Sequence, residues 1–263
     1  MFQQGDCHMN TTILNKKLHG LVATILLGGL SALAQMSGTG APAGVSGGML
    51  KLLGNFSAFE AKGRIEVLDG KSLELQSATP IDFALLEKKM RIEMDLARMT
   101  GKATPAFVLT TLEKLGMSRV VSLIRPDKKA IYIIYPGQKV VCRLALPKEE
   151  AEAAGKESKV EKTVLGKETL DGHPCVKNRV VLTDETGNSI EATTWNATDL
   201  KEFPIKIETK EKDKIQLMRF QKVEFIRPDA KQFEPPADYQ QFTELDALMQ
   251  SVLEKQTSGG ASK

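Results

Sequence analysis

The sequence has few of the side chains that most often carry catalysis or bind metals. Its 263 residues include 3 histidines, 3 cysteines and 1 tryptophan. Beyond residue 34 only His173, Cys142 and Cys175 remain of the histidines and cysteines. A zinc site normally uses four such ligands, or three and a water molecule, and a hydrolytic triad needs an imidazole aimed at a nucleophile. We therefore expect no metal site, no cofactor and no catalytic residue.

Neither sign of charge dominates. The sequence has 36 lysines and arginines against 33 aspartates and glutamates, a formal net charge of +3. Basic residues alternate with acidic ones and form no block of the kind that binds nucleic acid. We expect no nucleic-acid partner, and the hydrophobic fraction of 41% is typical of a globular protein.

The N-terminal segment has the features of a signal peptide. Lys16 and Lys17 precede the apolar run GLVATILLGGLSALA, and Ala32 and Ala34 place small residues where a signal peptidase cleaves. The run is about 15 residues long, short of the roughly 20 that a membrane-spanning helix needs. We predict a signal peptide over residues 1–34, and hence an exported protein. An uncleaved membrane anchor is the alternative.

The segment after the signal peptide contains a run of small and polar residues. The stretch QMSGTGAPAGVSGG has almost no large apolar side chain, a composition typical of flexible linkers. We predict a linker over residues 35–55, a folded domain over residues 56–242, and a C-terminal helix with a flexible tail over residues 243–263.

Most of the folded domain alternates between apolar and polar residues, which is the period of a half-buried β-strand. Turn signals such as Asp69-Gly70 separate about nine to eleven such segments. We predict a mainly β fold, a single strongly curved antiparallel sheet or unclosed β-barrel with short turns between strands. In the stretch KKMRIEMDL, one face of the expected strand carries Met90, Ile92, Met94 and Leu96.

Two segments within the domain change to a helical period. The first begins at Thr104-Pro105 and ends before Gly116. The second, residues 146–158, is charged and rich in alanine and is expected to face solvent. The apolar positions of the first helix, spaced at helical intervals, are Val108, Leu112 and Leu115.

The C-terminal segment is predicted to form an amphipathic helix in the stretch TELDALMQSVLEKQ. Helices of this kind can insert their apolar side into grooves on partner proteins. The apolar stripe along this helix is therefore a candidate partner-binding surface. Its residues are Leu245, Leu248, Met249, Val252 and Leu253.

Cys142 and Cys175 are the cysteines that an exported chain would keep. In an oxidising compartment two cysteines are usually bridged when the geometry allows it. A disulfide between them would close a loop of about 33 residues and contribute roughly 3 to 4 kcal/mol in the chain-entropy model. The alternative is that both cysteines are buried free thiols, and the sequence does not decide between the two possibilities. His173 and Cys175 themselves fall in the stretch GHPC, which is typical of a turn that leads into a strand.

The order of these features resembles the periplasmic LolA-like family. The similarity covers about residues 56–242 and is carried by a G-x-E-x-x-x-G-x-x-C stretch over residues 166–175, a W-x-A-x-D-L-x-x-x-P stretch over residues 195–204, and a closing F-x-x-P-x-x-Y over residues 233–239. The chain lacks the arginine-bearing entrance motif of the true lipoprotein carrier and adds a C-terminal helix. It therefore looks like a relative of the carrier rather than the true carrier.

This resemblance implies an unclosed barrel with helices in its mouth and an apolar cavity that holds acyl chains. It also implies a non-enzymatic protein in the periplasm of a Gram-negative-type bacterium. The segment over residues 105–115 would be the lid. The candidate cavity residues are Met90, Ile92, Met94, Leu96, Val108, Leu112 and Leu115, although the same residues also suit an ordinary core.

Two functions are thus expected from different classes. The first is a carrier-like protein whose partner is a lipid or a lipidated protein. The second is a protein-interaction or sensor module of the cell envelope that uses the apolar stripe of the C-terminal helix.

Overall fold

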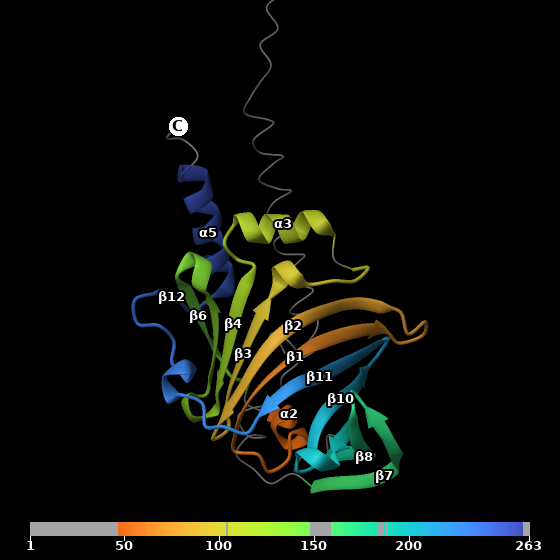
Figure 1. The fold of residues 1–263 in the computed structure, drawn as a ribbon. Coiled ribbons are helices and arrows are strands. Elements are labelled where there is room, and N and C mark those ends of the chain that lie inside the picture. Colours follow the sequence, from red (N-terminus) through yellow and green to blue (C-terminus); the bar gives the residue numbers. More distant parts are fainter. Residues whose placement is uncertain (1–46, 104, 148–158, 184–186, 188, 260–263) are drawn as a thin grey trace, which may run out of the picture. The chain divides into compact units, whose positions relative to one another are not determined.

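The alternating segments form a twelve-stranded sheet within the part of the chain that the computed structural model describes (Figure 1). The described residues are 47–103, 105–147, 159–183, 187 and 189–259, and they belong to one compact unit. The strands are β1 (Ala58–Asp69), β2 (Leu75–Leu86), β3 (Lys89–Asp95), β4 (Arg119–Arg125), β5 (Ala130–Tyr135), β6 (Val140–Ala145), β7 (Lys159–Leu170), β8 (His173–Thr183), β9 (Ser189–Ala197), β10 (Phe203–Glu211), β11 (Lys214–Glu224) and β12 (Gln240–Phe242).

Two runs of strands in chain order meet at the centre of this sheet. Strands β1 to β6 form one antiparallel run and β7 to β11 form another, and the runs join where β1 pairs with β11. Strand β12 pairs in parallel with the free edge of β6, the edge that does not pair with β5. In the described part of the chain the two end strands, β12 and β7, do not pair with each other, so the sheet is unclosed, as predicted.

The number of strands exceeds the predicted range of about nine to eleven. The additional short strand, β12, has three residues, too few to show an alternating pattern. Parallel pairing with β6 depends on tertiary packing, which the local sequence does not reveal.

The two faces of the sheet differ in polarity because successive side chains of a strand point to opposite faces. Strand β3 shows this directly, since Met90, Ile92 and Met94 are buried while Arg91 and Glu93 are only partly covered. Figure 1 shows the direction of the strands changing across the sheet, from the steep β4 and β6 at the left to β7 at the lower right. We call the apolar face the inner face and the charged face the outer face.

An aromatic cluster joins the two runs of strands on the apolar face. Phe59 of β1 stacks on Phe83 of β2 and meets Phe203 of β10 edge to face, with ring centroids 5.4 and 4.9 Å apart. Each such pair is worth about 0.5 to 1.5 kcal/mol beyond the area it buries. The rings in the cluster are Phe56, Phe59, Phe83, Phe203, Phe220 and Phe225.

The chain between β11 and β12 covers part of the outer face. Its 3₁₀ helix η6 (Ala230–Phe233) buries Phe233 against Ala84 and Leu86, and Tyr239 packs on an apolar cluster formed by β4, β5 and β6. We call residues 226–239 the outer strap. Because the strap covers the second face, all six residues of β5 are buried.

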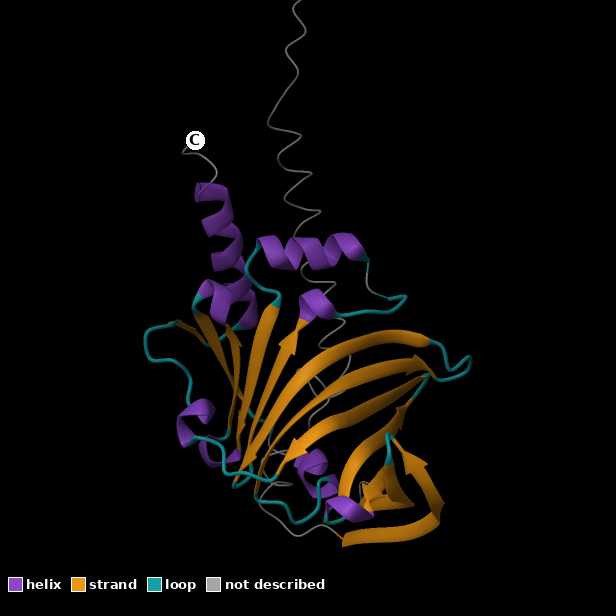
Figure 2. Cartoon of the chain, viewed as in Figure 1, coloured by secondary structure: helices purple, strands orange, loops and turns teal. Residues whose placement is uncertain are grey.

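The helices predicted near residues 105–115 and in the C-terminal segment are confirmed as α3 (Ala106–Lys114) and α5 (Leu245–Gly259), and Figure 2 shows both with the sheet. The predicted helix over residues 146–158 lies, apart from its first two residues, outside the described part, as does the signal peptide. Among the described residues, no helix is long and apolar enough to cross a membrane.

The predicted linker over residues 35–55 requires a correction at its C-terminal end. Residues 47–52 form helix α2 (Gly47–Leu52), which contacts β8 and β9. Leu52 and Leu53 are buried. These two leucines follow the glycine-rich run that suggested a linker, and packing against the sheet makes them part of the folded domain.

Candidate functional site

Three cavity candidates lie on the apolar face of β3 and the fourth, Leu96, follows the strand directly. Met90 and Ile92 are 0% exposed, and Met94 and Leu96 are each 2% exposed. Leu96 follows the strand in the 3₁₀ helix η2 (Leu96–Arg98), whose first turn is capped by the Asp95 carboxylate accepting from the Ala97 amide. The predicted alternation therefore continues from the strand into the first residue of the next element.

The candidate lid lies across the end of the sheet where β3 passes into η2. Helix α3 contacts η2, as Figure 1 shows. Val108 and Leu112 are half-buried and Leu115, at the helix end, is buried. No residue within α3 itself is buried, and Phe107 is 56% exposed. Of the three elements that carry the seven predicted residues, α3 is therefore the most loosely packed.

The apolar stripe of the C-terminal helix packs within its own domain. Leu248 and Val252 are 0% exposed and Met249 is 7% exposed, and α5 contacts β6 and β12. Leu245 and Leu253 are half-buried. Because these side chains already have partners in the chain, the helix offers no free stripe to another protein, and the module hypothesis loses the feature that suggested it.

The possible disulfide between Cys142 and Cys175 is not formed. Both residues are buried free thiols. Cys142 lies on β6 and Cys175 on β8, and eight strands separate these two in the order of the sheet. Burial raises the pKa of the Cys142 thiol to about 11 and also raises that of Cys175. Both side chains therefore stay protonated at neutral pH.

His173 has an acidic neighbour that sequence inspection did not find. Its Nδ1 lies 2.8 Å from Oδ2 of Asp199, a residue of the 3₁₀ helix η5 (Thr198–Leu200). The nearby Cys175 thiol donates to the carbonyl oxygen of His173 at 3.4 Å. A protonated, buried thiol held by a backbone carbonyl is not an activated nucleophile. The contact between His173 and Asp199 instead links the start of β8 to the turn after β9.

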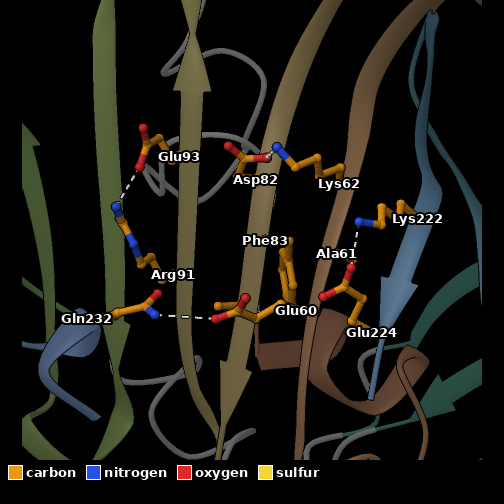
Figure 3. Close-up of a pocket in the computed structure, with 11 residues that line it drawn as sticks. Glu60, Ala61, Lys62, Asp82, Phe83, Arg91, Glu93, Lys222, Glu224 and Gln232 are labelled. Carbon is orange, nitrogen blue, oxygen red and sulfur yellow. Dashed lines mark hydrogen bonds and ion pairs between the residues drawn. The ribbon is translucent and has the colours of Figure 1, made fainter. Parts of the chain in front are cut away.

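A pocket of about 300 Å³ opens on the charged outer face. None of the seven predicted cavity residues lines it. It lies over β1, β2, β3 and β11 and is bounded by the outer strap (Figure 3). Its lining residues are Glu60, Ala61, Lys62, Asp82, Phe83, Ala84, Arg91, Glu93, Lys222, Glu224 and Gln232.

Ion pairs between neighbouring side chains organise most of this pocket. Lys222 and Glu224 form a pair at 2.6 Å along β11, and Lys62 reaches Asp82 on the next strand at 3.6 Å. Arg91 pairs with Glu93, which also binds Arg119. In the strands, a basic residue stands two positions before a glutamate in the stretches RIE and KVE. Residues two apart share one face of a strand, so this spacing is the sequence signal for these ion pairs.

Metal binding finds no support in the described part of the chain, where no group of three or more histidine, cysteine, aspartate or glutamate side chains could hold an ion. The functional candidates are therefore the apolar face with α3 and the charged outer pocket.

The fold resembles that of LolA-like proteins. No family model and no curated protein matches the chain. A LolA superfamily protein from Nitrosomonas europaea is 9% identical, with 72% of this chain and 98% of that chain covered and a TM-score of 0.35. The lipoprotein LppX from Mycobacterium tuberculosis is 10% identical, with 66% and 90% covered and a TM-score of 0.35.

The Pseudomonas aeruginosa MucA/MucB complex also resembles the chain. The identity is 13%, 74% of this chain and 62% of that chain are covered, and the TM-score is 0.36. At these identities the likeness concerns the fold alone, and scores of this size support no conclusion about a ligand or a partner.

Proposed function

We propose that this chain is an exported, non-enzymatic protein of the cell envelope that binds a lipid or a lipidated protein. The acyl chain would lie against the apolar face of the curved sheet, beneath α3. The observation that carries this proposal is the row of buried apolar side chains from Met90 on β3 to Leu96 on η2, next to helix α3, which contacts η2 and has no buried residue.

The loose packing of α3 supports its role as a lid. Its half-buried residues, Val108 and Leu112, are covered on one side only, so lifting the helix breaks few apolar contacts. Burying an acyl chain contributes about 0.8 kcal/mol per methylene. Ten buried methylenes therefore provide roughly 8 kcal/mol before the costs of ordering, enough to compensate for moving a short helix.

Mass spectrometry provides the direct test. The full-length chain is expressed with its own N-terminal segment in a Gram-negative host, purified from the envelope fraction and extracted with organic solvent. We expect a lipid in stoichiometric amount. A protein that yields no lipid, and that also fails to bind an apolar fluorescent probe such as phenylnaphthylamine, would refute the proposal.

Two substitutions on α3 test the position of the ligand. Leu112→Asp places a charge on the half-buried side of the helix, and we expect it to weaken probe binding about tenfold or more, since an unpaired charge next to an acyl chain is costly. Thr110→Asp, on the exposed side of the same helix, is the matched control and should leave the affinity unchanged. Equal effects of both would contradict a ligand beneath α3.

A further inference from the structure

Ser122 places a polar side chain in the middle of the apolar inner face. Its neighbours along β4, Val121 and Leu123, pack in the apolar cluster that the outer strap covers. Successive side chains of a strand point to opposite faces, so the side chain of Ser122 points to the inner face. Its direct partners in the ladders are Ile92 on β3 and Ile133 on β5. Ser122 itself is 0% exposed.

The hydroxyl group of Ser122 has no hydrogen-bond partner within the described residues. Buried side-chain atoms in this condition are Nε of Arg64, Oγ of Ser122, Oδ1 of Asn178 and Nε of Arg219. The two arginines nevertheless form ion pairs, and Asn178 donates a hydrogen bond from its Nδ2. A serine side chain has a single polar atom. Ser122 is therefore the one side chain of these four that is left wholly unpaired.

An unpaired hydroxyl in an apolar face is unfavourable for the fold. A buried polar group without a partner lowers stability, because folding removes it from water and returns no hydrogen bond. An alanine would fit the same position of β4 without this cost. The cost is offset if a molecule bound to the inner face supplies the partner.

The hydroxyl lies deep in the region that the acyl chain would cover. Ile92, the ladder partner of Ser122, stands four residues before Leu96, where η2 begins next to α3. At 3.2 to 3.4 Å per residue of strand, this separation is about 13 Å. The partner of Ser122 is therefore an atom of the ligand's interior and not an atom held at the lid.

We propose that Ser122 forms a hydrogen bond with an oxygen atom in the apolar part of the bound lipid. This inference rests on the proposed function, because it places that oxygen beside Ile92 on the face that would hold the acyl chain. Two sources supply the same chemistry. A chain that enters first brings a hydroxyl group on the acyl chain to Ser122, and a head group that enters first brings the carbonyl oxygen of the ester.

Matched pairs of lipids test the role of the oxygen atom. The full-length protein is purified from the envelope fraction and freed of copurified lipid, and affinities are measured by displacement of phenylnaphthylamine. The first comparison is stearate with hydroxystearates that carry the hydroxyl group at different positions along the chain. The second is monostearoylglycerol with octadecylglycerol ether, which lacks only the ester carbonyl. In each pair the ratio of affinities reports the oxygen alone.

Ser122→Ala is expected to change one of these ratios. The variant should bind the oxygen-bearing lipid about five- to tenfold more weakly relative to its partner than the wild type does, as expected for the loss of one hydrogen bond. A change confined to the hydroxystearates identifies a hydroxyl on the chain, and a change confined to the glycerol lipids identifies the ester carbonyl.

Two controls separate ligand recognition from a structural role. Ile133→Val shortens the side chain directly opposite Ser122 and should weaken both members of a pair alike, so that the ratios stay as in the wild type. Ligand-free Ser122→Ala should melt at the wild-type temperature or above it, because it loses no hydrogen bond within the chain.

Two results overturn the inference while leaving the proposed function intact. One is that Ser122→Ala binds these lipids with every ratio unchanged. The other is a lower melting temperature of ligand-free Ser122→Ala, which would show that the hydroxyl has a partner in the fold. A wild-type chain that binds none of these lipids would overturn the proposed function and this inference together.

Discussion

Arg125 donates a hydrogen bond from its Nη1 to the backbone carbonyl oxygen of Phe233, 2.7 Å away, although 108 positions separate the two residues in the sequence. The guanidinium also binds Asp127 and Glu234, at 2.7 and 2.6 Å, and its side chain is 4% exposed. One buried arginine thus fastens the outer strap to the end of β4.

Substitution of Arg125 by alanine is expected to lower the free energy of unfolding by about 2 to 3 kcal/mol. The change leaves the Phe233 carbonyl without its donor and two carboxylates without their cation. Urea denaturation measures the effect. Arg227→Ala removes an exposed pair with Glu87 and should cost less than about 1 kcal/mol. A similar loss in both variants would show that the strap does not depend on Arg125.

The same cluster predicts a dependence of stability on acidity. Hydrogen bonds from Arg125 lower the pKa of Asp127, and hydrogen bonds from Lys128 and Arg125 lower the pKa of Glu234. Carboxylates with lowered folded-state pKa values stabilise the fold above their ordinary pKa values and lose that contribution as the pH falls through the lowered values. Stability should therefore decrease as the pH drops below about 4.5.

Comparison with the Arg125→Ala variant isolates this contribution. Unfolding free energies measured between about pH 6 and pH 3 should decline less steeply in the variant, because its carboxylates have lost the partner that lowers their pKa values. Parallel curves for the two proteins would assign the acid sensitivity to other groups.

The buried thiols predict slow chemical modification. Cys142 and Cys175 are 0% and 3% exposed, and the thiolate is the reactive form. In the folded protein both should react with iodoacetamide far more slowly than in urea, and peptide mapping without reductant should recover both as alkylated cysteines. Recovery of a cross-linked peptide containing Cys142 and Cys175 would contradict the free thiols.

Two glycines at irregular points of the sheet should respond differently to alanine. A Cβ atom at Gly63 would lie 2.1 Å from the carbonyl oxygen of Arg219, whereas at Gly166 no heavy atom would lie within 4 Å. Both stand where a strand register shifts. Gly63→Ala should therefore cost about 1 to 3 kcal/mol and Gly166→Ala about 0.5 kcal/mol or less, as thermal unfolding can measure. Equal melting temperatures would contradict the close approach of β1 and β11.

The features predicted correctly from the sequence are those that depend on the order of residues within one strand or helix. The alternation in KKMRIEMDL correctly assigns Met90, Ile92 and Met94 to one face, because a strand side chain depends only on its own position along the strand. Helix α3 was found for a similar local reason, a proline at its start and apolar residues at helical spacing.

The outer pocket and the packing of α5 depend on contacts between residues far apart in the sequence, which the pattern within a single strand or helix does not show. Glu60 and Glu224 become neighbours only through the register of β1 with β11, and nothing within either strand sets that register. Likewise, the apolar stripe of α5 shows that one side of the helix is buried. It does not show that the burying surface is β6 of the same chain.

The pairing of β1 with β11 also determines how the sheet is completed while the chain is being made. Each other antiparallel ladder joins strands that follow one another, whereas this one connects residues 60–69 to residues 214–224. Until β11 has been synthesised, the first run of strands has an open edge along β1, with hydrogen-bonding groups available to a neighbouring chain. Newly made molecules therefore expose this edge as well as that of β6, which waits for β12, and a holdase that covers β1 would protect one of the two edges until the second run arrives.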